Sequence, residues 1–104
     1  MYLREKLLMN GLDVYHNIAE KLRLLRTLEG ISQQQIADSI HVNRSTYSYY
    51  ELGESKPPLD VLCALAEYFE VNIGYLTGTE EIRPGHKFYT LLKNKYTQGT
   101  RRVT

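Results

Sequence analysis

Residues 31–53 read ISQQQIADSIHVNRSTYSYYELG, a stretch that predicts two short helices joined by a tight connection. Ser32 is followed three residues later by Gln35, the spacing of a capping box, in which a hydroxyl and an amide satisfy two backbone donors at a helix start. The first of the two helices is therefore expected to run from about Gln33 to Ile40.

The second helix is predicted between Asn43, a good N-cap, and Gly53, a residue type suited to the left-handed backbone just past a helix end. Only His41 and Val42 separate it from the first helix. Two helices joined so closely must cross, and the positions between them hold Ile36, Ala37, Ile40, Val42, Tyr47 and Tyr50. Tyr49 points outward by helical geometry. The pattern is the outline of a helix-turn-helix unit.

A supporting helix is predicted ahead of this unit. Its apolar residues recur at helical spacing, and they are Ile18, Leu22 and Leu25. The helix starts either at Asn17, which has Glu20 three residues later, or near Val14 after Asp13. The sequence does not choose between these two starts. Gly30 ends the helix in either case.

Two more helices are predicted after the unit. Pro57 and Pro58 lack amide hydrogens and have fixed φ, so they stop one helix and start another. The inward stripe of this next helix is Leu62, Leu65, Ala66 and Phe69. Asn72 caps one last turn through Leu76. Residues 13–78 therefore form a compact five-helix domain, and the fold class is all-α.

Two segments flank this domain. Residues 1–12 are expected to form an N-terminal arm or a short helix. Residues 79–104 form a basic C-terminal extension, in which Phe88, Leu92 and Tyr96 lie four apart and favour a helix. A weak strand pattern at residues 96–103 is the exception to the helical periodicity.

Composition limits the class of protein. With 104 residues and 42% hydrophobic residues, the chain forms about one small domain plus an appendage, which excludes a large multi-domain enzyme. The longest apolar run, Val61 to Ala66, is too short to span a membrane. The N-terminal segment lacks the order of a secretory signal, and the single cysteine, Cys63, favours a reducing compartment. We therefore expect a cytoplasmic location.

Charge is unevenly distributed. Residues 1–79 carry 7 basic and 10 acidic residues, a net charge of −3, whereas residues 80–104 carry 6 and 2, a net charge of +4. Phosphate neutralisation supplies most of the nonspecific affinity for DNA, so a single copy of the acidic part should bind DNA weakly. A second copy, or the basic residues of the extension such as Lys93, Lys95, Arg101 and Arg102, would add phosphate contacts.

Residues 18–78 resemble the Cro/C1-type helix-turn-helix family of phage repressors and bacterial transcription regulators, which has the lambda-repressor-like fold. The matching positions are the stretch 31–37, the stretch 44–48, Glu51, Gly53, Pro57 and the stretch 71–73. Many independent positions agree in order and spacing, which makes the resemblance specific.

The resemblance implies a set of DNA contacts. The residues expected to face the bases are Asn43, Arg44, Ser45, Ser48 and Tyr49. The residues expected to contact phosphates are Gln33, Thr46 and Lys56. Arg26 and Glu51 match a buried ion pair of the family, which belongs to stability and not to DNA reading. The chemistry of arginine supports a base contact for Arg44, since two hydrogen bonds from arginine to guanine discriminate bases by roughly 1 to 3 kcal/mol.

Two positions depart from the family pattern. His41 and Glu70 stand where the family usually has glycine, so the helix ends there are less ideal. The cysteine and the histidines are expected to have no functional role. Cys63 is expected to be buried and inert. The histidines His16, His41 and His86 are dispersed, so neither a metal site nor a cofactor is expected, and without a recognisable catalytic group we expect a protein that is not an enzyme.

The predicted function is that of a sequence-specific transcriptional regulator that acts as a repressor, binding double-stranded DNA as a homodimer on a two-fold operator. Leu24 and Leu28 form a second apolar edge on the first helix. This edge is expected to be covered by the N-terminal arm or by a terminal helix carrying Phe88, Leu91 and Leu92, within the chain or from a second subunit. The alternative is an antitoxin or another protein-interaction module that binds a protein partner through its C-terminal segment.

Overall fold

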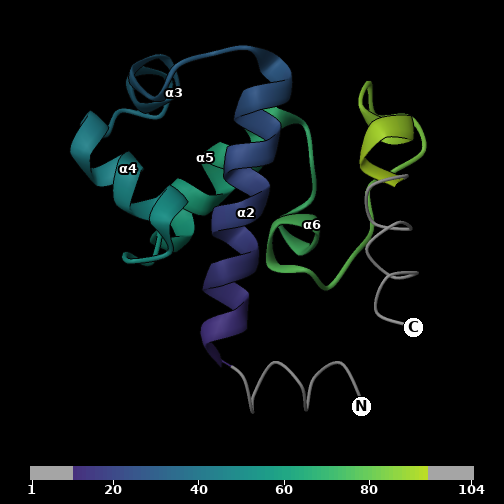
Figure 1. Cartoon of the computed structure of the whole chain (residues 1–104), viewed down its shortest axis with the longest axis horizontal. Coiled ribbons are helices and arrows are strands. Elements are labelled where there is room, and N and C mark those ends of the chain that lie inside the picture. The colour runs from purple at the N-terminus through teal and green to yellow at the C-terminus, as the bar shows by residue number, and fades with distance from the viewer. Residues whose placement is uncertain (1–10, 94–104) are drawn as a thin grey trace.

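The computed structural model describes residues 11–93 of the chain, and side chains from residue 14 onward. In this part the chain forms helices joined by turns and loops, which confirms the all-α class. The helices are α2 (Gly11–Glu29), α3 (Gln33–Ser39), α4 (Arg44–Leu52), α5 (Leu59–Phe69) and α6 (Ile73–Thr77) (Figure 1). Residues 1–10 of the expected arm lie outside the described residues, and α2 already includes residues 11 and 12.

Helix α2 forms the centre of the molecule, with α3 and α4 on one side of it and α6 on the other (Figure 1). Its predicted inward residues Ile18, Leu22 and Leu25 are buried. The helix begins earlier than either predicted start. Asn17 is therefore not a cap: it lies within α2, and its Nδ2 donates to the Thr77 carbonyl at 3.3 Å. The start at Asn17, one of the two alternatives, is therefore wrong, and so is the start near Val14, because the helix already begins at Gly11.

Helices α2 to α5 end in the same backbone motif. After α3, the amide of His41 donates to Asp38 and the amide of Val42 donates to Ala37, which is the Schellman pattern. The residue at the left-handed position of the motif is Gly30 after α2, His41 after α3, Gly53 after α4 and Glu70 after α5. His41 has φ 61° and Glu70 has φ 58°, so both non-glycine residues adopt the left-handed conformation.

Helix α5 buries Leu62, Leu65, Ala66 and Phe69, as its sequence pattern predicts. Cys63 is a correction, because the structure places it at the surface. One residue turns an α-helix by about 100°, so a position next to the buried stripe can face outward even within an apolar run. In residues 11–93 no helix combines the length and apolar character needed to cross a membrane.

The described part of the C-terminal extension packs on the domain. Ile82 and Leu92 belong to the buried core, and Phe88 packs against it, as do Leu24 and Leu28 of α2. Residues 89–93 begin a helical turn. Tyr96, the weak strand pattern at 96–103 and the basic residues Lys95, Arg101 and Arg102 lie outside the described residues.

His86 connects this extension to the end of α5 by a hydrogen bond. The backbone amide of Phe88 donates to His86 Nδ1 at 3.0 Å, so Nδ1 must be the acceptor nitrogen. Nε2 then carries the hydrogen and donates to the Phe69 carbonyl at 2.8 Å. That carbonyl belongs to the last residue of α5, where no helical partner is available. At the same end of the molecule Lys87 forms an ion pair with Glu29 of α2 at 2.9 Å.

Candidate nucleic-acid interface

The start of α3 is fixed by local hydrogen bonds. The Ser32 hydroxyl accepts from the Gln35 amide at 3.1 Å, and the Gln35 side-chain oxygen accepts from the Ser32 amide at 2.8 Å. This is the capping box that the sequence predicts, now confirmed. The box holds the first turn of α3 at the surface, and the side chains of Gln34 and Gln35 are exposed there.

Helix α4 packs against α3 partly through buried apolar side chains. Ile36 and Ala37 of α3 are buried, and so are Tyr47 and Tyr50 of α4. The two tyrosine rings pack edge to face, with centroids 6.3 Å apart. Anchoring one side of α4 in this way exposes its opposite side, and Tyr49 is 50% exposed while Tyr47 is 0% exposed.

The five residues expected to face DNA bases differ in exposure and in the hydrogen bonds that they already make. Arg44, Ser45 and Tyr49 are exposed, whereas Ser48 is half-buried. Asn43 is exposed too, but its Oδ1 accepts from the Thr46 amide at 2.8 Å as the N-cap of α4. The amide NH₂ of Asn43 is therefore the group left to donate outward.

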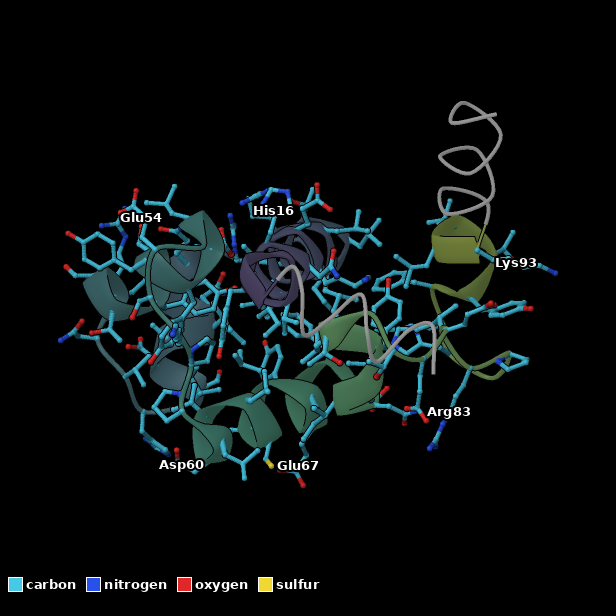
Figure 2. The ribbon with its side chains drawn as sticks, turned by 90° about the horizontal axis from the view of Figure 1, so that it is seen from below. His16, Glu54, Asp60, Glu67, Arg83 and Lys93 are labelled. Atoms are coloured by element: carbon cyan, nitrogen blue, oxygen red, sulfur yellow. The ribbon has the colours of Figure 1, made fainter. Side chains whose placement is uncertain are left out.

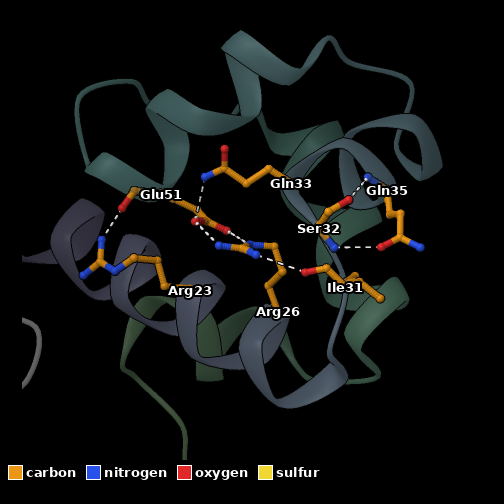
Figure 3. A network of polar contacts seen from close by, with 7 residues as sticks. All are labelled: Arg23, Arg26, Ile31, Ser32, Gln33, Gln35 and Glu51. Carbon is orange, nitrogen blue, oxygen red and sulfur yellow. Dashed lines mark hydrogen bonds and ion pairs between the residues drawn. The ribbon is translucent and has the colours of Figure 1, made fainter.

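Gln33, expected at a phosphate, lies at the junction of α3, α4 and α2 (Figure 3). Its Nε2 donates to Glu51 Oε1 at 3.1 Å, which uses one of its two N–H groups and leaves the other. Arg26 of α2 binds the same carboxylate through Nε at 2.6 Å and Nη2 at 3.1 Å, and it also donates to the Ile31 carbonyl. The expected ion pair thus also holds the Gln33 side chain in place.

Glu51 is buried at the centre of this network. Burial alone would raise the pKa of its carboxyl, but the hydrogen bonds from Arg26 and Gln33 lower that pKa below its ordinary value. Burial also raises the pKa of Tyr47, whose hydroxyl makes no hydrogen bond within the described residues. Arg26 has a raised pKa because of its hydrogen bond to Glu51. The network therefore holds one negative and one positive charge at neutral pH.

The two other residues expected at phosphates lie at opposite ends of α4. Thr46 is half-buried in the first turn. Lys56 follows the helix, is exposed, and has its Nζ 5.1 Å from the centre of the Tyr15 ring of α2. A cation over an aromatic face is held by the quadrupole of the ring, so the ammonium has a preferred position that still faces solvent.

The sequence did not reveal two features of this surface. Arg23 of α2 donates through Nη1 to the Glu51 carbonyl, a contact between residues 28 apart that has no local pattern. Leu52 is exposed on the last turn of α4, and its spacing of three from Tyr49 was a signal that could have placed it on the outer face. In residues 14–93 no three His, Cys, Asp or Glu side chains are grouped so that they could hold a metal ion.

The model of a family described as helix-turn-helix matches residues 22–76, more than half of the chain, and this range contains α3 and α4 together. No solved structure matches the chain significantly.

Several relatives share this part of the chain. YobD of Bacillus subtilis (strain 168), an uncharacterized HTH-type transcriptional regulator, is 37% identical over 59 residues, or 57% of this chain and 53% of the relative. Repressor protein C of Escherichia phage P2 is 49% identical over 47 residues, or 45% of this chain and 48% of the relative. The HTH-type transcriptional activator BcrR of Enterococcus faecalis is 35% identical over 63 residues, or 61% of this chain and 31% of the relative. The matched part thus covers about half of these relatives or less.

Proposed function

The chain belongs to the helix-turn-helix family, and from this membership we propose that it regulates transcription by binding a specific sequence of double-stranded DNA through α3 and α4. The observation that carries the proposal is the outer face of α4. Arg44, Ser45 and Tyr49 are exposed there, while the opposite face is anchored by buried tyrosines. A helix that is fixed on one side and exposes hydrogen-bonding groups on the other fits the major groove.

The DNA contact proposed for each residue follows from its position. Arg44, at the first position of α4, donates two hydrogen bonds to one guanine. Ser45 and Ser48 bond base edges, and the free N–H of Asn43 does the same. Gln33, Thr46 and Lys56 contact phosphates, which sets the register of the helix without reading bases. In the described part of the chain no acidic side chain forms an ion pair with Arg44.

We propose further that the protein acts as a homodimer and represses transcription by occupying its operator. Two copies double the number of phosphate contacts, which strengthens the weak DNA binding expected of a single copy. Their recognition helices would read half-sites about 34 Å apart on a two-fold site. Repression needs only occupancy, and one relative is a phage repressor by name. Analytical ultracentrifugation tests the dimer, and a monomeric mass at micromolar concentration would contradict it.

The alternative of a protein-interaction module places the partner on residues 79–104. In the described part of that segment, Ile82 and Leu92 are buried in the core of this chain. His86 and Lys87 also bond to α5 and α2. These side chains are already engaged within the molecule, which favours DNA binding over a partner at this place.

Fluorescence anisotropy with the DNA upstream of the gene, and with a scrambled duplex, tests the proposed function at low and near-physiological salt. Arg44→Ala is expected to weaken binding to the specific duplex by about 5- to 150-fold, the loss of one guanine contact. Lys56→Ala should weaken both duplexes alike and reduce the salt slope by about 1. Arg83→Ala is the control, since Figure 2 shows Arg83 far from the end of α4 marked by Glu54. Equal weak binding to both duplexes, unchanged in Arg44→Ala, would refute the proposal.

A further inference from the structure

Two large apolar side chains are exposed on α4. Tyr49 is 50% exposed and Leu52 is 59% exposed, although the other large apolar residues of this helix, Tyr47 and Tyr50, are buried. An isolated exposed leucine is common on protein surfaces and calls for no explanation by itself. What singles out Leu52 is its position on the helix.

The position follows from helical geometry. Successive residues of an α-helix are rotated by about 100°, so Leu52, seven residues after Ser45, lies within about 20° of it on the helix surface. Tyr49 lies beside the same line. The buried residues Tyr47 and Glu51 face the other way. Leu52 therefore lies in the middle of the outer face and not at its margin.

The outer face changes character along the helix. Its first part carries Arg44, Ser45 and Ser48, whose side chains are all able to form hydrogen bonds. Its last part carries Tyr49 and Leu52, which offer an aromatic ring and a branched apolar side chain. With a rise of about 1.5 Å per residue, Ser45 and Leu52 are about 10 Å apart, which corresponds to about three base pairs of DNA.

Base edges in the major groove offer one apolar group, the methyl group of thymine. We propose that Leu52, together with Tyr49, reads thymine methyl groups about three base pairs from the base pair that faces Ser45. This inference rests on the proposed function and deepens it, because it names the chemistry of part of the half-site. Each half-site is then expected to have guanine where Arg44 binds and thymine where Leu52 binds.

Leu59 provides a matched control. It is more exposed than Leu52, at 71%, but it is the first residue of α5. Its neighbour Asp60 lies on the opposite edge of the molecule from Glu54, which follows α4 (Figure 2). A leucine at this second edge shares the exposure of Leu52 without sharing its place on α4. Leu59→Ala should therefore leave base preference unchanged.

The test uses the full chain and its preferred duplex, selected from a randomised pool. Each thymine is replaced in turn by uracil, which removes only the methyl group, and the dissociation constant is measured by fluorescence anisotropy. In the wild type, uracil at the thymine under Leu52 is expected to weaken binding about fourfold, the effect of one buried methyl group. The same replacement should have no effect in Leu52→Ala, and it should retain its effect in Leu59→Ala and in Leu52→Met.

Three results would overturn the inference. If every uracil replacement costs the same in the wild type and in Leu52→Ala, Leu52 does not read a methyl group. If Leu52→Ala changes the sedimentation mass with the uracil effect intact, Leu52 contacts a second copy of the chain. If the wild type selects no preferred sequence, the proposed function fails and the inference fails with it, and this result is distinct from the other two because it appears before any variant is made.

Discussion

Glu51 is a buried carboxylate on α4 that accepts hydrogen bonds from α2 and α3 at once. Its side chain is 3% exposed and that of its partner Arg26 is 22% exposed. A buried charge that loses its partner retains the full cost of leaving water, so the pair matters most when only one member is removed. The Arg26–Glu51 pair therefore stabilises the fold, and through Glu51 it also positions Gln33 for its proposed DNA contact.

Arg26→Ala is expected to lower the free energy of unfolding by about 3–5 kcal/mol, because it leaves Glu51 charged and buried. Urea unfolding followed by circular dichroism measures the change. Lys87→Ala is the control, since it breaks an exposed ion pair and should leave the midpoint almost unchanged. Arg26→Met combined with Glu51→Leu should recover most of the loss, and a double variant as unstable as Arg26→Ala would contradict this account.

The lowered pKa of Glu51 also predicts how stability depends on pH. Because the pKa is lower in the folded state than its ordinary value of 4.5, the unfolded chain takes up the proton first as the pH falls. The stabilisation by this carboxylate is therefore complete above about pH 5 and is lost as the pH falls below 4.5. Unfolding at a series of pH values should show the gap between wild type and Glu51→Gln narrowing in this range. If the difference in free energy of unfolding stays constant with pH, or if Glu54→Gln shows the same pH dependence, this prediction is contradicted.

At the scale of elements, the ends of α2 to α5 form a natural comparison. The same Schellman motif is closed by glycine after α2 and α4 and by His41 or Glu70 after α3 and α5. A residue with a side chain costs roughly 1–2 kcal/mol in the left-handed conformation, which glycine adopts freely. Glu70 adds a negative charge at the negative end of a helix dipole. The turn of the helix-turn-helix unit is therefore strained at His41, and the end of α5 is strained at Glu70.

Glu70→Gly is expected to stabilise the fold by about 1 kcal/mol, and His41→Gly by a similar amount. Thermal unfolding measures both, and the two gains should add because the sites share no partner. Gly30→Ala is the converse control. A Cβ at Gly30, with φ +72°, would meet nothing within 4 Å, so any loss of stability there reports backbone conformation alone. No gain in either glycine variant would mean that these turns are not strained.

At the scale of the whole molecule, the extension after α6 completes the core. Leu92 is 4% exposed and its neighbour Leu91 is 58% exposed. Both side chains have the same chemistry and sit in the same helical turn. Comparing substitutions at these two positions therefore separates the effect of packing on stability from that of local helix propensity.

Leu92→Ala should lower the free energy of unfolding by about 2–5 kcal/mol, since it removes a buried side chain and leaves a cavity. Leu91→Ala should change it by no more than about 0.5 kcal/mol. Both values come from chemical denaturation of the full chain. Equal small effects would show that the extension does not pack on the domain in solution, and the protein-interaction alternative would then gain support.

Local features of this fold could be predicted from the sequence because their partners lie within a few residues. The capping box of Ser32 and Gln35, the limits of α4 at Asn43 and Gly53, and the inward stripe of α5 are of this kind. Such features depend on hydrogen bonds and periodicity that a short stretch of chain contains in full.

Other features depend on residues that the sequence separates widely. Asn17 bonds a carbonyl 60 residues away, Gln33 bonds a carboxylate 18 residues away, and Lys87 pairs with a residue 58 positions earlier. No local pattern contains such partners, so Asn17 resembled a helix cap and Gln33 resembled a purely DNA-facing residue. The exposure of Cys63 and of Leu52 was set in the same way, by which side of each helix the rest of the molecule covers. Packing between distant segments makes that choice, because each helix offers several faces and only its neighbours in space determine which of them is excluded from water.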